Sequence, residues 1–196
     1  EWDLNLSAAP AQLDLGWSVR RVTADPAGTA ADVANINIGE ELLDGLHAST
    51  LDLSEERDYL NLGAGGSFPG GGGDDFAVSA EGYVLLADGS TSGLFNVHLN
   101  SDDGVRLRLN GDIVGEFVDP TGNCNVAINS LLLSNGDHLE VTYFERGGAD
   151  KLFFRLASGT DAEGPYIGSV DSGILITTTS IIPEPTTMAL FFARVI

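Results

Sequence analysis

The sequence predicts an all-β protein, an antiparallel β-sandwich with one short helix and extended terminal strands. Apolar and polar residues alternate with period two along most of the chain, which is the pattern of strands with one buried face. Turn sequences rich in Gly, Asn and Asp separate these stretches at the spacing of hairpins. A single segment has clear helical periodicity instead.

The first half of the chain contains a strand, the helix and a loop. The first strand of the sandwich is expected where apolar residues alternate at Leu13, Leu15, Trp17 and Val19. The helix is expected from Gly39 to His47, behind an Asn37 cap, because its leucines share one face. Glycines and Pro69 fill the stretch from Gly63 to Gly73, so we expect a loop there.

The second half predicts successive hairpins. Strand patterns at 95–99 and 105–109 precede Asn110-Gly111, the strongest short hairpin signal, and the turns 134–137 and 147–150 frame another strand pair. We expect one core to contain Leu107, Leu109, Val141, Tyr143, Leu152 and Phe154. Arg106 and Arg108 alternate with these residues, so we expect them on the solvated face.

Both ends carry additional strand patterns. Apolar residues alternate at 2–6 and again at 174–179, and a Pro-Glu-Pro sequence at 183–185 precedes a short apolar run. That run is too short to span a bilayer, which needs about 20 residues. We therefore expect an N-terminal arm at 1–11, the sandwich at 12–157, a linker with an extra strand at 158–182, and a tail at 183–196.

Composition excludes some partners and favours others. The 196 residues include 29 acidic and 9 basic side chains, for a net charge of −20. Nucleic acids and anionic membrane surfaces need clustered cations, so neither is an expected partner. Strong acidity favours secretion and hard cations such as calcium. The chain opens at Glu1 without an initiator Met or a signal-peptide pattern, as a mature secreted chain would.

One stretch resembles a known family. The sequence 101–111, Ser-Asp-Asp-Gly-Val-Arg-Leu-Arg-Leu-Asn-Gly, is similar to the signature of the protective-antigen-type (PA-fourteen) β-sandwich. The sequences at 68–70, 76–78 and 143–149 extend the likeness over roughly 12–157. The resemblance implies a domain carried by an exported bacterial protein.

The C-terminal sequence resembles a second signal. Residues 182–190, Ile-Pro-Glu-Pro-Thr-Thr-Met-Ala-Leu, are similar to the start of a PEP-CTERM sorting tail. This resemblance implies an extracellular or cell-surface location. The tail departs from the full pattern, because only one Arg and few apolar residues follow the motif.

Asp102 and Asp103 are the sharpest site prediction. Adjacent carboxylates at a strand entry are costly unless a cation or N–H groups neutralise them, and calcium accepts such oxygens. In sugar-binding relatives the matching pair holds a calcium that bridges to glycan hydroxyls. The resemblance therefore implies that Asp102 and Asp103 bind calcium and, through it, a glycan. The alternative is a turn whose Asp side chains cap backbone N–H groups. Asp150 and Asp75 are further candidate ligands.

Catalysis has no support in the sequence. No spacing of Ser, His and acidic residues matches a catalytic arrangement, so we expect no enzyme. The Glu145-Arg146 pair is interpreted as structural, with each residue pairing to other strands.

The terminal strands predict assembly. A free alternating strand can complete the sheet of a neighbouring copy, and repetition gives a fibre. We therefore expect a secreted, calcium-stabilised structural protein that forms a filament or surface matrix by strand donation. The alternative is a calcium-dependent glycan-binding adhesin at the cell surface. The expected subunit contacts are Trp2, Leu4, Leu6, Ile174, Ile176, Met188, Leu190, Phe191 and Phe192.

Overall fold

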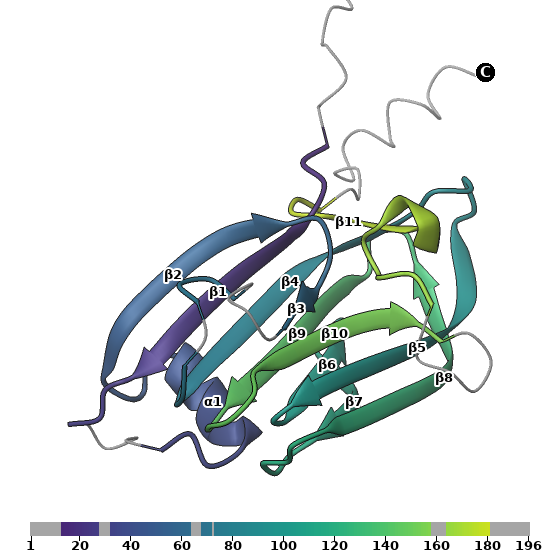
Figure 1. Cartoon of the computed structure of the whole chain (residues 1–196). Coiled ribbons are helices and arrows are strands. Elements are labelled where there is room, and N and C mark those ends of the chain that lie inside the picture. Colours follow the sequence, from purple (N-terminus) through teal and green to yellow (C-terminus); the bar gives the residue numbers. More distant parts are fainter. Residues whose placement is uncertain (1–12, 28–31, 64–67, 72, 158–163, 181–196) are drawn as a thin grey trace, which may run out of the picture.

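The computed structural model describes residues 13–27, 32–63, 68–71, 73–157 and 164–180. Within these ranges two antiparallel sheets pack face to face, and one helix covers the outer face of the larger sheet (Figure 1). The elements in chain order are β1 (Trp17–Ala24), α1 (Ile36–Leu43), β2 (Ser49–Arg57), β3 (Asn61–Leu62), β4 (Phe76–Leu86), β5 (Ser92–Asp102), β6 (Val105–Leu109), β7 (Asp112–Phe117), β8 (Cys124–Ser134), β9 (His138–Glu145), β10 (Lys151–Leu156), the 3-10 turn η1 (Val170–Ser172) and β11 (Ile174–Thr177).

The predicted sandwich is confirmed. The larger sheet has the order β2-β1-β4-β9-β6-β7, with β11 also paired to β4, and the smaller sheet has the order β3-β10-β5-β8. The core between them contains the predicted inward-facing set, of which Leu109 alone is only partly buried. A second apolar cluster joins Ile36 and Leu42 of α1 to Ala77 and Phe144 on the outer face of the larger sheet.

The predicted turns are also confirmed. Asn110 and Gly111 have φ angles of 53° and 90° between β6 and β7, as a two-residue hairpin turn requires. Gly136 has a φ of 87° in the 134–137 turn between β8 and β9. Residues 147–150 connect β9 to β10, so each hairpin signal marks a strand reversal.

The helix begins and ends earlier than expected. Asn35, not Asn37, is the cap, because its side-chain oxygen accepts from the backbone N–H of Asn37 at 2.9 Å and of Ile38 at 3.2 Å. Gly45 follows the helix with a φ of 75° and ends it. Leu46 is therefore exposed rather than packed on the sheet.

The expectation that Arg106 and Arg108 face solvent is wrong, because α1 covers this part of the sheet. The Arg106 side chain is 7% exposed and lies 2.6 Å from a carboxylate oxygen of both Glu40 and Glu116. Arg108 also pairs with Glu40. The part of the outer face around Arg106 and Arg108 is thus ion-paired rather than freely solvated.

The predicted strand at 174–179 does not reach into a neighbour. β11 pairs antiparallel with β4, and Ile174 and Ile176 are 0% and 1% exposed in the main core. Gly82 makes room for it, since a Cβ there would lie 2.2 Å from the Ile176 side chain. The prediction that Ile174 and Ile176 contact another subunit is therefore wrong, and the sandwich extends past residue 157.

The other predicted subunit contacts lie outside the described residues. They are Trp2, Leu4, Leu6, Met188, Leu190, Phe191 and Phe192. Assembly through the chain ends therefore stays a prediction, as does the sorting tail.

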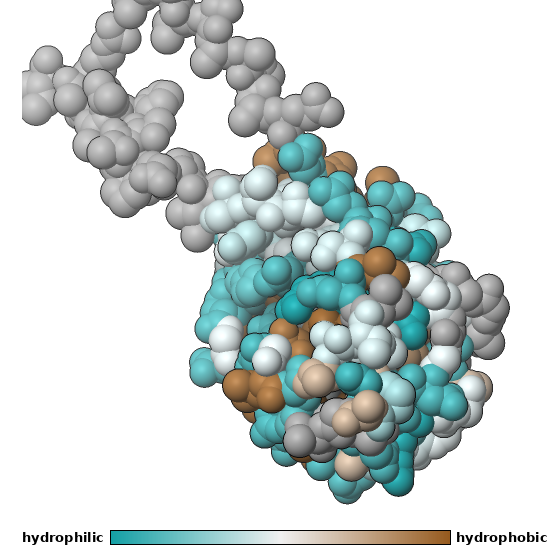
Figure 2. Space-filling model, turned by 90° about the vertical axis from the view of Figure 1, so that its left-hand side faces the viewer, coloured by the Kyte–Doolittle hydropathy of each residue, from teal (hydrophilic) through white to brown (hydrophobic). Residues whose placement is uncertain are grey.

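The face in Figure 2 is mainly hydrophilic, with separate hydrophobic patches. Among the described residues no helix is long and apolar enough to cross a membrane.

Candidate metal centre

Three carboxylates meet where strands of both sheets begin or end. Asp102 is the last residue of β5, Asp103 lies in the turn to β6, and Glu145 is the last residue of β9. One oxygen from each lies within 4.8 Å of the others. The pairing of β6 with β9 brings Glu145 to the two aspartates, although they are far apart in sequence. The peptide bond between Asp102 and Asp103 is cis.

Asp103 fits the alternative of a capping turn. Its carboxylate accepts from the backbone N–H of Thr121 and of Arg146, each at 2.8 Å. Its carbonyl oxygen accepts from the Ser101 hydroxyl at 2.7 Å. Asp103 therefore ties two loops to the β5–β6 turn. Each of its carboxylate oxygens keeps a lone pair that these hydrogen bonds do not use.

Asp102 is in a different position. Among the described residues no N–H or O–H donates to its carboxylate, although the residue is only 9% exposed. Burial raises the pKa of Asp102, and the negative charge of Asp103 raises it further against the opposing effect of Lys151. A bound cation would offset both the energetic cost of burying the Asp102 charge and its repulsion from Asp103.

Glu145 is the residue that sequence reasoning missed. It is 0% exposed, and one carboxylate oxygen accepts from the Tyr143 hydroxyl at 2.5 Å, while the other has no hydrogen-bond partner in the described ranges. Burial raises its pKa to about 7, and the charges of Asp103 and Asp102 add to the shift despite hydrogen bonds from Tyr143 and the Gly147 backbone. A signal was present, because Val141, Tyr143 and Glu145 share the inward face of one strand.

The two further candidate ligands, Asp150 and Asp75, lie in different parts of the structure. Asp150 lies beside Asp102 in a depression, and its Oδ2 atom is buried without a hydrogen-bond partner from the described part of the chain. Asp75 lies elsewhere: it accepts from the backbone N–H of Val33 at 3.1 Å, near Asp32 and Asp74. Burial raises the pKa of Asp75, but Asp75 belongs neither to the three-carboxylate cluster nor to the depression that Asp102 and Asp150 line, so its prediction as a ligand is not supported.

The depression next to the cluster has a volume of about 500 Å³. It is lined by Asn61, Gly63, Asp102, Ala149, Asp150, Lys151 and Phe153. Gly63 leaves room for the Phe153 ring, since a Cβ there would lie 3.3 Å from it. An amide, an ammonium group, an aromatic ring and two carboxylates thus surround one open space.

The donor set fits a hard cation. Calcium takes six to eight oxygen ligands in flexible geometry, and carboxylates are its usual protein ligands. Two buried carboxylate oxygens, on Glu145 and Asp150, lack hydrogen-bond partners among the described residues, which is costly unless something neutralises them. Asp102, Asp103, Glu145 and Asp150 are therefore the residues that would hold calcium.

Comparison with known proteins identifies the fold. No protein-family model matches the sequence, and no curated protein matches it. The structure is similar to the PA14 domain of the MpAFP antifreeze protein, with a TM-score of 0.58, 20% identity, and coverage of 90% of this chain and 97% of that one.

Two adhesin domains are also similar. The PA14 sugar-binding domain from an RTX adhesin has a TM-score of 0.53 at 17% identity, over 78% of this chain and 93% of that one. The Epithelial Adhesin 9 A domain from Candida glabrata, solved with Galb1-4GlcNAc, has a TM-score of 0.56 at 11% identity, over 89% and 94%. At these identities the likeness concerns the fold, and this chain is a β-sandwich with a PA14-like fold.

Proposed function

We propose that this chain is a calcium-dependent glycan-binding domain of an extracellular adhesin. The observation that carries the proposal is the open depression beside the buried carboxylate cluster, with unpartnered oxygens on Glu145 and Asp150. Bound calcium would supply coordination to sugar hydroxyls, a chemistry that oxygen-rich sites with flexible geometry support.

The lining of the depression suits a sugar. Asn61 and Lys151 offer N–H donors to ring hydroxyls, and the Phe153 ring offers an apolar surface to the C–H face of a pyranose. Lys151 is held in place by donating to the Asn123 side chain at 2.7 Å. Specificity would come from these three side chains, because the cation itself accepts many pairs of hydroxyls.

The structural neighbours support this reading over the filament. They include a domain named as sugar-binding and an adhesin domain solved with a disaccharide. These neighbours are adhesin and antifreeze domains rather than enzymes, which favours binding without catalysis and a location at the cell surface.

A glycan array probed with and without calcium tests the proposal. We expect binding in millimolar calcium that EDTA abolishes. Asp102→Asn should weaken calcium binding at least about tenfold by calorimetry, because it removes a charged ligand. It should not destabilise the calcium-free protein and should stabilise it near neutral pH, because burial and the neighbouring Asp103 disfavour the charged form of Asp102.

Two further variants separate the parts of the site. Asp171→Asn is the control, because it changes an exposed acid in η1, which lies at the end of the sandwich opposite to the carboxylate cluster (Figure 1). This variant should alter neither the calcium affinity nor the glycan affinity. Phe153→Ala should weaken glycan binding while calcium affinity is retained. Equal glycan signals in calcium and in EDTA would contradict the proposal, as would unchanged calcium affinity in Asp102→Asn.

A further inference from the structure

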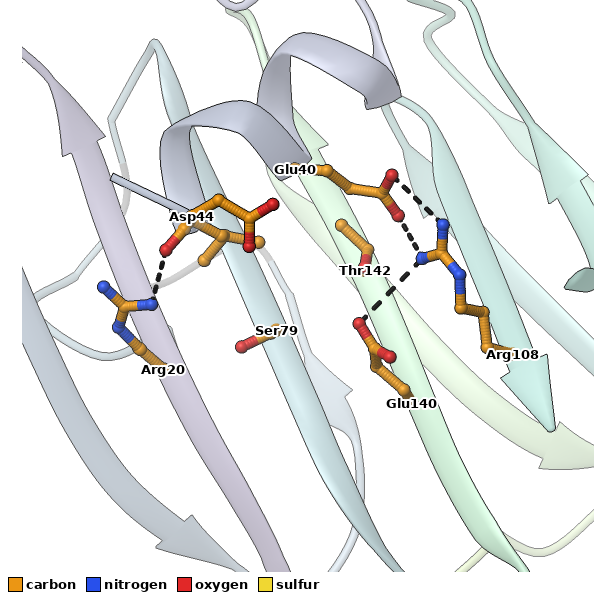
Figure 3. Close-up of a pocket in the computed structure, with 8 residues that line it drawn as sticks. Arg20, Glu40, Asp44, Ser79, Arg108, Glu140 and Thr142 are labelled. Carbon is orange, nitrogen blue, oxygen red and sulfur yellow. Dashed lines mark hydrogen bonds and ion pairs between the residues drawn. The ribbon is translucent and has the colours of Figure 1, made fainter. Parts of the chain in front are cut away.

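A second pocket lies on the other side of the larger sheet, under the C-terminal end of α1 (Figure 3). Its volume is about 270 Å³. Arg20, Ser79 and Thr142 form its floor, as neighbours in register across β1, β4 and β9. The helix contributes the opposite wall through Glu40, Leu43 and Asp44. The pocket shares no residue with the depression beside the carboxylate cluster.

The cationic groups of this pocket already have partners. Arg20 donates to both carboxylate oxygens of Asp52, at 3.1 and 3.0 Å, and to the Leu43 carbonyl at 2.6 Å. Arg108 pairs with Glu40 through both oxygens, as Figure 3 shows. An anionic ligand would have to displace these partners, so the pocket does not favour anions.

The remaining polar groups are held more weakly. Thr142 is 1% exposed, and its hydroxyl has no hydrogen-bond partner among the residues that the structure describes, which is unusual for a buried polar atom. Among the described residues no hydrogen bond reaches the Ser79 hydroxyl or the Asp44 carboxylate. Within the part of the chain that the structure describes, Glu140 makes a 3.9 Å contact with Arg108, and the charge of Asp44 acts on Arg20 without a hydrogen bond. Two hydroxyls and two carboxylates therefore line one small space.

These groups select a ligand that donates hydrogen bonds and carries positive charge. Hydroxyl oxygens and carboxylates all accept from an ammonium group, which has three donors. The negative end of a helix dipole and the net charge of −20 favour a cation at the same place. A neutral polyol would satisfy the hydrogen bonds but would not use the two carboxylates as charges.

We propose that this pocket binds a compact organic cation through a primary ammonium group, held by Asp44, Glu140, Ser79 and Thr142. The group could belong to an amino sugar or to an aliphatic amine. This site goes beyond the proposed glycan function and does not depend on calcium.

Calorimetric titrations in EDTA test the proposal with matched ligands. Glucosamine carries the ammonium group, N-acetylglucosamine removes its charge, and n-butylamine removes the sugar ring. EDTA silences the calcium site, so failure here is distinguishable from failure of the proposed function. We expect saturable binding of glucosamine, butylamine or both. Comparing their affinities shows whether the pocket prefers an amino sugar or an aliphatic amine. N-acetylglucosamine should not bind.

Variants connect the binding to the pocket. Glu140→Gln should weaken ammonium binding about tenfold, and Thr142→Val about fivefold, the ratio for one net hydrogen bond. Thr142→Val should not lower the melting temperature, because its hydroxyl has no partner to lose. Thr23→Val is the matched control, since the Thr23 hydroxyl is also buried without a partner but lies outside the pocket.

Several outcomes would overturn the proposal. One is the absence of binding by both ammonium compounds, and another is equal binding of the N-acetylated sugar. Unchanged affinity in both Glu140→Gln and Thr142→Val would assign the ammonium to another place on the protein.

Discussion

Raising the pH from about 5 to 7.5 should destabilise the calcium-free protein through Glu145. Burial raises the pKa of this carboxyl from 4.5 to about 7 in the folded state. The folded protein thus keeps a proton that the unfolded chain has lost. The stabilising effect of that proton is fully present below pH 4.5 and is lost as the pH rises through 7.

The size of the effect follows from the two pKa values. Each pH unit between them changes the free energy of unfolding by about 1.4 kcal/mol, so the whole interval amounts to about 3 kcal/mol. Since Glu145 is 0% exposed, solvent screening does not reduce this figure appreciably. Asp102 contributes in the same direction, because burial and Asp103 also raise its pKa.

Urea unfolding at several pH values in EDTA measures the effect, with Glu145→Gln as the reference. The amide keeps the shape and still accepts from Tyr143, but it does not titrate. The difference in unfolding free energy between wild type and variant isolates Glu145 from all other groups. Adding calcium should flatten the wild-type curve, because calcium binds the deprotonated carboxylates and stabilises the folded state by mass action.

Parallel pH curves for wild type and Glu145→Gln in EDTA would refute this reasoning. They would mean that Glu145 titrates at its ordinary pKa in the folded protein. A wild-type curve that calcium leaves unchanged would instead remove Glu145 from the ligand set.

Three other substitutions and one exposed control test the packing, each by urea unfolding at constant pH. Arg106→Ala should lower the free energy of unfolding by about 2 to 4 kcal/mol, because two carboxylates lose their buried cation. A loss below about 0.5 kcal/mol would mean that the Arg106 side chain is solvated. Ile176→Ala should cost about 2 to 5 kcal/mol and Leu94→Ala, which is 68% exposed, under about 0.5. Equal small losses would argue that β11 is not part of the core. Gly104→Ala should cost about 1 to 3 kcal/mol, since its Cβ would lie 2.4 Å from the Phe144 ring; wild-type stability would contradict the close approach.

The strands and turns were predictable because their signals are local. Alternation at Leu107, Val141 and Phe154 depends only on neighbours two residues away, and Asn110-Gly111 adopts its turn whatever it packs against. The same rule failed for Arg106, whose surroundings depend on a helix more than sixty residues earlier in the chain. Alternation assigns a side chain to a face but does not say what covers that face.

The candidate site was predictable only in part. The adjacent pair Asp102-Asp103 is visible in the sequence, yet Asp103 turned out to bind two backbone N–H groups while Asp102 binds none. The sequence does not distinguish Asp75 from Asp150 as a ligand, because the positions of their loops depend on the tertiary structure. The terminal strand at Ile174 and Ile176 has the same alternation whether it joins its own sheet or a neighbour's, so pattern alone could not decide between them.

The sequence by itself determined the strand pattern, the hairpin turns and the excess of acidic side chains. Tertiary structure alone decided which of those acids meet, because the register of β6 with β9 brings Asp102 to Glu145 and that of β5 with β10 brings it to Asp150, both from a distant segment of the chain. It also decided that α1 closes a polar pocket over the outer face of the larger sheet. The physical reason is that hydrogen-bonded pairing and burial act between residues that are remote along the chain, while periodicity and turn propensity act between neighbours.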